Sequence, residues 1–361
     1  MPTEGVHYVF QRGNICIRLN RETGLIDEYS LNGVNYVKPG AFALEVYEDN
    51  FDPWYMEKQY ESTWRNKIGS FMLADKEEAQ RFGCLDTPID PVHIIEDGAV
   101  RTVAEVLFTY GSARAVVKYI MSEREGLKLD VQLIWAEKQK LVKLNIPAAF
   151  ATEECIGEHV YGRESLKKDL VENVSQKYTA LCGEGQAILA VNNGTYGSSF
   201  DEKAGELKLT LLRSPGYCTH PLPNLNAVPQ DRYIAYIDQG ERSYEFLFQI
   251  GAKETLLHTA ARVAQQFNMR PMLLAFYPEA GGNRPEAPVQ LLENDCIQMT
   301  ALKRSDDGNA YIIRLFNPTE HPQTALVLAG EAKLKVSFGS FELKTLRWEV
   351  GALRECEITE A

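Results

Sequence analysis

The chain has 361 residues and a hydrophobic content of 45%, so it is long enough to form two or three domains with buried cores. Fifty acidic residues outnumber 38 basic ones and give a formal net charge of −12, with no cluster of Lys and Arg. Nucleic acids and anionic membrane surfaces are therefore disfavoured as partners. We also expect no membrane insertion and no export, because the sequence lacks an apolar run of spanning length and a signal-peptide pattern.

Cysteine and histidine spacing bears on the compartment and on metal binding. The seven cysteines have no CxxC spacing, and their odd number leaves one unpaired in any complete set of disulfides. Reduced thiols in a cytoplasm are therefore predicted. The six histidines are isolated from one another, so their spacing does not indicate a zinc site, and we predict no metal ligands in this chain.

Period-two alternation of hydrophobic and polar residues recurs along the chain and predicts half-buried antiparallel strands. Turn residues that accept a positive φ, such as Asn32-Gly33 and Asn192-Asn193-Gly194, separate these segments. Each strand is expected to have one exposed and one buried face. The clearest alternations occur at residues 129–135, 142–146, 207–211 and 334–338.

One segment has helical periodicity instead. Its apolar stripe consists of Leu256, Ala260, Val263, Ala264 and Phe267. This spacing predicts one amphipathic helix that ends near Asn268.

The helix marks a domain boundary, because a Pro- and Gly-rich stretch and a second group of strands follow it. The predicted layout is a large β-sandwich at residues 1–250, a helical connector and loop at 251–290, and a small β-sandwich at 291–361.

The segment AVNNGTYGSSFDEKAGELKLTLLRSP at residues 190–215 resembles the β-sandwich region that follows the catalytic domain in glycoside hydrolase family 38 α-mannosidases. Other segments resemble the same region, in the same order, over nearly the whole chain. They include CIRLNRETGLIDEYSLNGVNYV, LEVYEDNFDPWYM, VRTVAEVLFTYG, LKLDVQLIWAEKQKLVKLNIP, GEHVYGRES, QKYTAL, DQGER, YIIRLFNPT and FELKTLRW.

The resemblance implies an all-β fold, in which a large galactose-mutarotase-like supersandwich and one connecting helix precede a small terminal β-sandwich. It also implies that the intact enzyme is a retaining, zinc-dependent α-mannosidase. Retention needs two carboxyl groups, and the family's nucleophile, an Asp that touches the zinc, belongs to an N-terminal domain with an HxHxD-like segment that this sequence lacks. We therefore assign no catalytic residue and no cofactor to this chain, and expect the zinc in the missing catalytic domain.

Three residues are candidates for the carbohydrate cleft. The resemblance places Arg163 and Tyr196 where the β region approaches the catalytic site. Each could instead have a purely structural role, Arg163 in a salt bridge within the sheet and Tyr196 in packing at the end of a hairpin. Trp54 belongs to an aromatic-rich stretch that suits sugar stacking but is also explained by core packing.

A structural pair is expected between Arg213 and Asp238. Across neighbouring strands, such a pair would fix the long, Pro-rich loop at residues 214–232, which is a candidate for a rim of the cleft.

The function expected from the resemblance is that of a non-catalytic region of the intact enzyme. It would support the N-terminal catalytic domain and line the carbohydrate cleft, and a homo-oligomer is a possible further partner. Two alternatives stay open. One is an autonomous carbohydrate-binding module. The other is an aldose epimerase, for which His159 and Glu164 are the nearby acid and base candidates.

Overall fold

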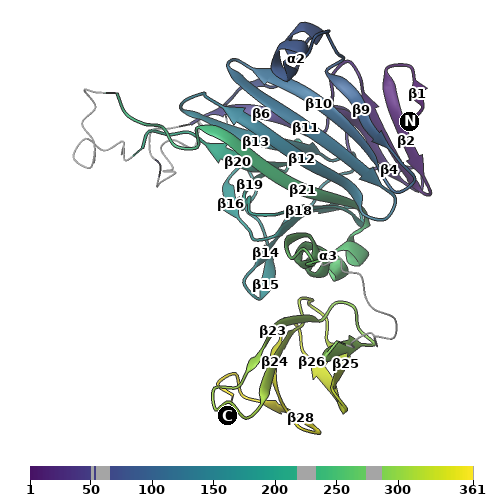
Figure 1. Cartoon of the computed structure of the whole chain (residues 1–361), viewed down its shortest axis with the longest axis vertical. Coiled ribbons are helices and arrows are strands. Elements are labelled where there is room, and N and C mark those ends of the chain that lie inside the picture. Colours follow the sequence, from purple (N-terminus) through teal and green to yellow (C-terminus); the bar gives the residue numbers. More distant parts are fainter. Residues whose placement is uncertain (50–52, 54–65, 218–232, 274–286, 361) are drawn as a thin grey trace, which may run out of the picture. The chain divides into compact units, whose positions relative to one another are not determined.

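The computed structural model describes residues 1–49, 53, 66–217, 233–273 and 287–360, which form two compact units. Unit 1 consists of Met1–Gly157 and Ser165–Leu256, and unit 2 of Glu158–Glu164 and Leu257–Ala361. Antiparallel strands make up most of both units (Figure 1).

The strands of unit 1 that the structure describes belong to three sheets, and the end of the β14–β15 hairpin in the largest sheet, residues 158–164, is part of unit 2. The five-stranded sheet has the order β1 (Thr3–Glu4), β2 (His7–Arg12), β3 (Ile15–Asn20), β4 (Ile26–Leu31) and β5 (Val34–Asn35). The six-stranded sheet has the order β16 (Glu172–Val174), β19 (Gly197–Asp201), β20 (Glu206–Arg213), β13 (Lys140–Pro147), β6 (Ala43–Glu48) and β7 (Lys67–Ser70). The ten-stranded sheet has the order β15 (Gly162–Ser165), β14 (Glu154–His159), β17 (Tyr178–Gly183), β18 (Gln186–Asn192), β21 (Gly240–Ala252), β12 (Gly126–Trp135), β11 (Ala113–Ser122), β10 (Thr102–Tyr110) and β8 (Met72–Leu73), with β9 (Val92–Asp97) also paired to β10.

The apolar core of unit 1 draws on all three sheets. One continuous cluster of buried side chains includes Ile17 of β3, Leu144 of β13 and Phe248 of β21. The hydroxyl of Tyr29 in β4 donates a hydrogen bond to the carbonyl oxygen of Phe248 (3.1 Å) and so joins two of the sheets. Gly126, at φ +94°, lies beside this bond, where a Cβ atom would be 2.6 Å from the Tyr29 hydroxyl oxygen. Only glycine fits this close approach.

The expected alternation of exposed and buried faces is confirmed in β12, where Leu129 and Leu133 are buried and Gln132 is exposed. It is wrong for β13 and β20, because both faces of these strands are buried and Lys143 and Lys208 are only 2% and 6% exposed. Lysine can occupy such positions when opposite charges bind its ammonium group, as they do here.

The predicted helix is α3 (Lys253–Asn268), which ends at Asn268 as expected. Its buried side chains include Leu257, Ala260 and Ala264, and the boundary between the two units falls within its first turn. No helix in the described part of the chain is long and apolar enough to cross a membrane.

A second helix, α2 (Lys76–Gly83), was not expected from the sequence. It begins after Asp75, whose carboxylate accepts a hydrogen bond from the backbone N–H of Glu78 at 2.7 Å. Only Ala79 of this helix is buried, so its hydrophobic periodicity is too weak to reveal it.

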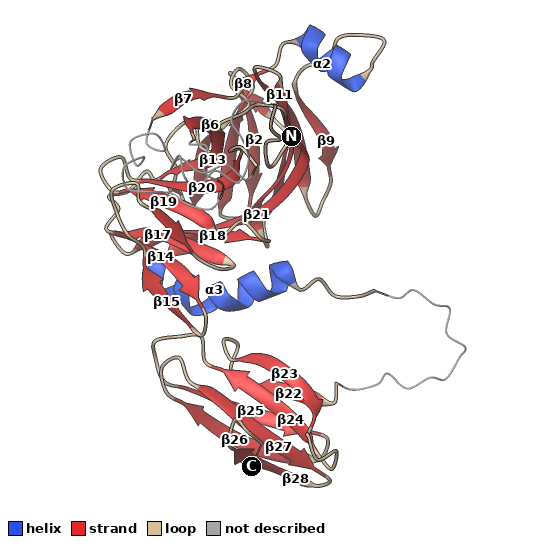
Figure 2. Ribbon diagram, turned by 90° about the vertical axis from the view of Figure 1, so that its left-hand side faces the viewer, coloured by secondary structure: helices blue, strands red, loops and turns tan. Residues whose placement is uncertain are grey.

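The terminal part of unit 2 is a small two-sheet sandwich (Figure 2). Its three-stranded sheet has the order β22 (Val289–Leu292), β25 (Gln323–Ala329) and β26 (Ala332–Phe338). Its four-stranded sheet has the order β23 (Gln298–Arg304), β24 (Tyr311–Phe316), β27 (Leu343–Glu349) and β28 (Ala352–Cys356). Buried residues of both sheets, among them Ile313 and Val327, form a separate core. The predicted all-β fold, with a large multi-sheet part before a small sandwich, is confirmed.

Candidate functional site

Polar and charged side chains cluster on the face of the six-stranded sheet that points away from the apolar core. Leu144 and Leu209 join the core, so their chain neighbours Lys143 and Lys208 point to the opposite face. All six strands of the sheet contribute to this cluster, which we call the charged network. It consists of Glu45, Tyr47, Lys67, Lys143, Asn145, Glu172, Ser199, Glu206, Lys208 and Thr210.

Glu45 is bound by three donors. Its Oε2 atom accepts hydrogen bonds from the Tyr47 hydroxyl (2.6 Å) and from Lys208 Nζ (3.0 Å), and its Oε1 atom accepts one from Lys67 Nζ (2.6 Å). Lys208 Nζ also donates to Glu206 Oε2 at 2.6 Å. The side chains of Glu45 and Lys208 are 5% and 7% exposed, so the attraction between them must offset the loss of hydration of both charges.

Lys143 forms the second centre of the network. Its Nζ atom donates to Glu172 Oε2 (2.6 Å) and to Ser199 Oγ (2.8 Å). The ammonium groups of Lys143 and Lys208 lie 5.8 and 6.0 Å from the centroid of the Tyr47 ring, so one ring attracts both cations. Three lysines face three glutamates in the network, and their formal charges cancel.

Burial raises the pKa of Glu45, but the Lys208 ammonium and the hydrogen bonds from Lys67 and Tyr47 lower it by more, so the net pKa lies below its usual value. Burial lowers the pKa of Lys208, but Glu45 and Glu206 raise it by more, so the net pKa lies above its usual value. Glu45 therefore stays ionised and Lys208 protonated at neutral pH. Groups in these states position one another and are not acids or bases poised for proton transfer near neutrality.

The structure places Arg213 and Asp238 in two different ion pairs. Arg213 Nη2 and Nε donate to Asp49 Oδ1 and Oδ2 at 2.8 and 3.1 Å, and the Asp49 side chain is fully buried. Asp238 lies 3.7 Å from Arg242 on an exposed turn. The expected pair is thus replaced by two others, because Arg213 ends β20, Asp49 follows β6, and both of these strands pair with β13.

Tyr196 lies in a tight turn between β18 and β19 and is 52% exposed. The turn is shaped by buried Asn192, whose Oδ1 atom accepts hydrogen bonds from the backbone N–H groups of Gly194 and Thr195, both at 3.0 Å. The Nδ2 atom of Asn192 donates to the carbonyl oxygen of Gln176 (2.9 Å). The Tyr196 ring is therefore presented to solvent by an ordered backbone.

Arg163 makes its contacts inside unit 2. Its Nη1 atom donates to the carbonyl oxygen of Leu257 (3.0 Å) and its Nη2 atom to Glu320 Oε1 (2.7 Å), and its side chain is only 8% exposed. The edge of the Tyr161 ring meets Phe316 at a centroid distance of 5.1 Å in the same unit. These contacts favour the structural alternative for Arg163.

His159 and Glu164 face each other directly. The Nε2 atom of His159 lies 3.0 Å from Glu164 Oε1, and the two side chains are 42% and 64% exposed. An acid and a base that act on a sugar must stand on either side of it. This exposed pair has no room between its members for a substrate.

The described residues offer no centre for a metal. Among them, no group of three or more His, Cys, Asp or Glu side chains could hold an ion, so they do not fit the zinc that the resemblance implies. Trp54, the third cleft candidate, lies outside the described residues.

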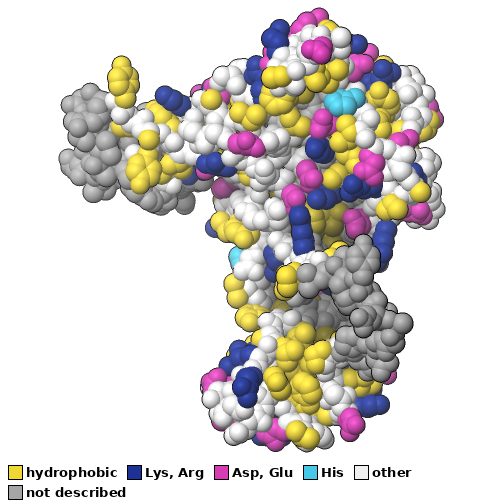
Figure 3. Space-filling model, viewed as in Figure 1, with side chains coloured by type: hydrophobic (Ala, Val, Ile, Leu, Met, Phe, Trp, Pro, Cys, Tyr) yellow, Lys and Arg dark blue, Asp and Glu magenta, His cyan; other side chains and the backbone are white. Residues whose placement is uncertain are grey.

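The outer face of the ten-stranded sheet carries interspersed charges of both signs (Figure 3). A pocket of about 240 Å³ on this face is lined by residues that include Lys118, Asp130 and Gln132. Lys118 pairs with Glu105 (3.4 Å) and Asp130 with Lys128 (3.1 Å). Such half-exposed pairs contribute little to stability and leave no unbalanced field for a charged ligand.

The fold and these contacts define an all-β protein of the sandwich class, in which the buried charges hold the strands of a sheet together. The model of the glycosyl hydrolases family 38 C-terminal domain matches residues 10–230, more than half of the chain. The model of the glycosyl hydrolases family 38 C-terminal beta sandwich domain matches residues 297–360. The chain belongs to the family of glycosyl hydrolase family 38 C-terminal regions, as the sequence indicated.

Two solved structures from Enterococcus faecalis share the fold. One is an alpha-mannosidase from strain V583, with a TM-score of 0.71, 13% identity and coverage of 94% of this chain and 42% of that one. The other is a protein in the glycosyl hydrolase family 38, with a TM-score of 0.72, 12% identity and coverage of 94% and 44%. This chain thus spans less than half the length of either protein. No curated protein matches the chain at a significant level.

Proposed function

We propose that this chain is the non-catalytic β region of a retaining, zinc-dependent α-mannosidase, where it supports the catalytic domain and lines its carbohydrate cleft. The observation that carries this proposal is the extent of the matches. Two family 38 C-terminal models match in chain order. The match to the alpha-mannosidase from Enterococcus faecalis includes 94% of this chain but only 42% of that protein. The remaining part of such an enzyme would supply the nucleophile and the zinc.

The charged network suits a supporting role. It ties together six strands that are widely separated in the sequence, and its ion pairs need fixed geometry to offset their desolvation. A sheet held in this way would give the catalytic domain a rigid surface. Rigid support matters because catalytic groups lose activity when they are misplaced by about 1 Å.

Within this proposal, Tyr196 is the residue that would contact sugar or the loops around it, since its ring is exposed on an ordered turn. Arg163 would instead position the hairpin tip at residues 158–164, since both of its terminal nitrogens are engaged.

Turnover of a chromogenic α-mannoside by this chain, with and without added zinc, tests the proposal. We expect no turnover in either condition. Zinc-stimulated hydrolysis by the chain itself would show that the proposal is wrong.

The role of Tyr196 at the cleft has its own test in an enzyme that contains both the catalytic domain and this region. In that enzyme, Tyr196→Ala should raise KM. The control Tyr233→Ala, at a fully exposed tyrosine, should leave KM unchanged.

A further inference from the structure

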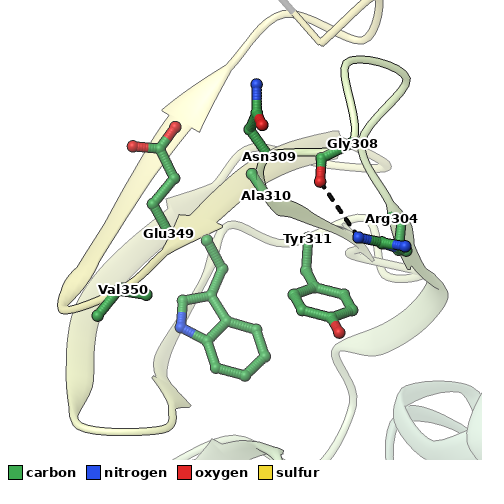
Figure 4. A pocket seen from close by; sticks show the side chains of 8 residues that line it. Arg304, Gly308, Asn309, Ala310, Tyr311, Glu349 and Val350 are labelled. Carbon is green, nitrogen blue, oxygen red and sulfur yellow. Dashed lines mark hydrogen bonds between the residues drawn. The ribbon is translucent and has the colours of Figure 1, made fainter.

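An aromatic surface lies at one end of the four-stranded sheet of unit 2. Tyr311 at the start of β24 pairs in register with Trp348 of β27 on one side and with Arg304 of β23 on the other. Directly opposed residues of antiparallel strands share one face of a sheet, so these three side chains are neighbours. The ring centroids of Tyr311 and Trp348 lie 5.3 Å apart with planes 35° apart, and Figure 4 shows Tyr311 with Arg304 beside it.

This surface forms part of a pocket of about 220 Å³. Tyr311 is 47% exposed, so its ring is open to solvent. Trp348 is held more firmly, since it packs against the core of unit 2 and lies beside Gly330. A Cβ atom at Gly330 would be only 3.2 Å from Trp348 Cζ2, so the glycine leaves room for the indole. The pocket thus combines one fixed ring with one accessible ring.

Hydrogen-bonding groups border the two rings. Within the described part of the chain, the Tyr311 hydroxyl and the Trp348 indole N–H bind no other group, and Arg304 donates only to the carbonyl oxygen of Gly308, at 3.4 Å. Glu349 also lines the pocket, but its carboxylate accepts a hydrogen bond from Arg347 Nε (2.7 Å) and points away from the Tyr311 ring (Figure 4), so Arg304 supplies the charged group beside the rings.

We propose that this surface is a carbohydrate-binding site that accepts a neutral pyranose ring. A pyranose has an apolar C–H face that packs on aromatic rings, and hydroxyl groups at its edge that accept hydrogen bonds from Arg304, Tyr311 and Trp348. The site lies wholly within unit 2 and does not depend on the function proposed for the cleft.

Isothermal titration calorimetry of the whole chain with methyl α-mannoside, a mannotriose and methyl β-glucoside tests the site. We expect at least one of these sugars to bind with a Kd on the order of 1 mM. Tyr311→Ala and Arg304→Ala should each weaken binding about tenfold, the loss that 1.4 kcal/mol of contact energy produces. Both residues are exposed, so the variants should keep the wild-type Tm, and Tyr233→Ala is the matched control.

Three outcomes would overturn the site. The first is no heat with any of the three sugars. The second is binding that Tyr311→Ala leaves intact, which places the sugar elsewhere; loss of binding in Tyr196→Ala would then point to the cleft turn. The third is a dimer in analytical ultracentrifugation that Tyr311→Ala dissociates, which shows that the rings contact a second copy of the chain.

Discussion

Arg213 holds the buried carboxylate of Asp49 through its Nε and Nη2 atoms, at 3.1 and 2.8 Å. The pair spans β13, because Leu141 of that strand pairs in register with Arg213 on one side and with Tyr47, near the end of β6, on the other. It therefore connects the ends of β20 and β6 across the strand between them.

Arg213→Met should destabilise unit 1 by about 3 kcal/mol, because it removes the bidentate partner of a buried carboxylate. The change in the free energy of unfolding can be measured by urea denaturation. Arg242→Met is the matched control, since the pair of Arg242 with Asp238 is exposed and 3.7 Å long, and should cost less than about 0.5 kcal/mol. Equal effects of the two substitutions would contradict a special role for Arg213.

Lys208→Met should also destabilise the protein by about 3 kcal/mol, because it leaves Glu45 and Glu206 without a shared cation. The double variant Lys208→Met/Glu45→Gln should lose less stability than the sum of the losses in the two single variants. The difference, which is the coupling energy, should be about 1–3 kcal/mol for groups in one network. A double-mutant cycle from urea denaturation gives this coupling. Additive effects would mean that the two side chains do not act together. Lys118→Met is the control, because the ion pair of Lys118 with Glu105 is half-exposed.

The charged network should make stability fall in acid. The folded-state pKa of Glu45 lies below its usual value of 4.5, so its contribution to stability is fully present above that pH and is lost as the pH falls through the folded-state pKa. The difference in unfolding free energy between wild type and Glu45→Gln should therefore be greatest near neutral pH and shrink below pH 4.5. A difference that is independent of pH would mean that the ionised form of Glu45 is not the stabilising one.

The sequence predicted the all-β class and helix α3 because each depends on local periodicity. Leu129 and Leu133 alternate with polar residues that are indeed exposed or half-buried, and the stripe of α3 spaces Ala260 and Ala264 one turn apart. These patterns follow from the pitch of the backbone and need no knowledge of distant residues.

The charged network could not be predicted in the same way. Lys143 and Lys208 alternate with valine and leucine residues as solvent-facing lysines do, and only their distant partners Glu172 and Glu45 show that they are buried. The partner of Arg213 was missed for the same reason, since strand order is a tertiary property: β6 and β20 lie on either side of β13 although they are far apart in the chain.

The turn at residues 192–197 offers a last prediction, in which two substitutions in one loop should have opposite consequences. Asn192→Ala should destabilise unit 1 by about 2 kcal/mol, because it removes the acceptor of two backbone N–H groups and the donor to Gln176 from a buried position. Tyr196→Ala should change stability by less than about 0.5 kcal/mol, because the ring is exposed. Thermal and urea unfolding measure both effects. If Tyr196→Ala were as costly as Asn192→Ala, the ring would belong to the packing of the hairpin, and its proposed place at the cleft would be lost.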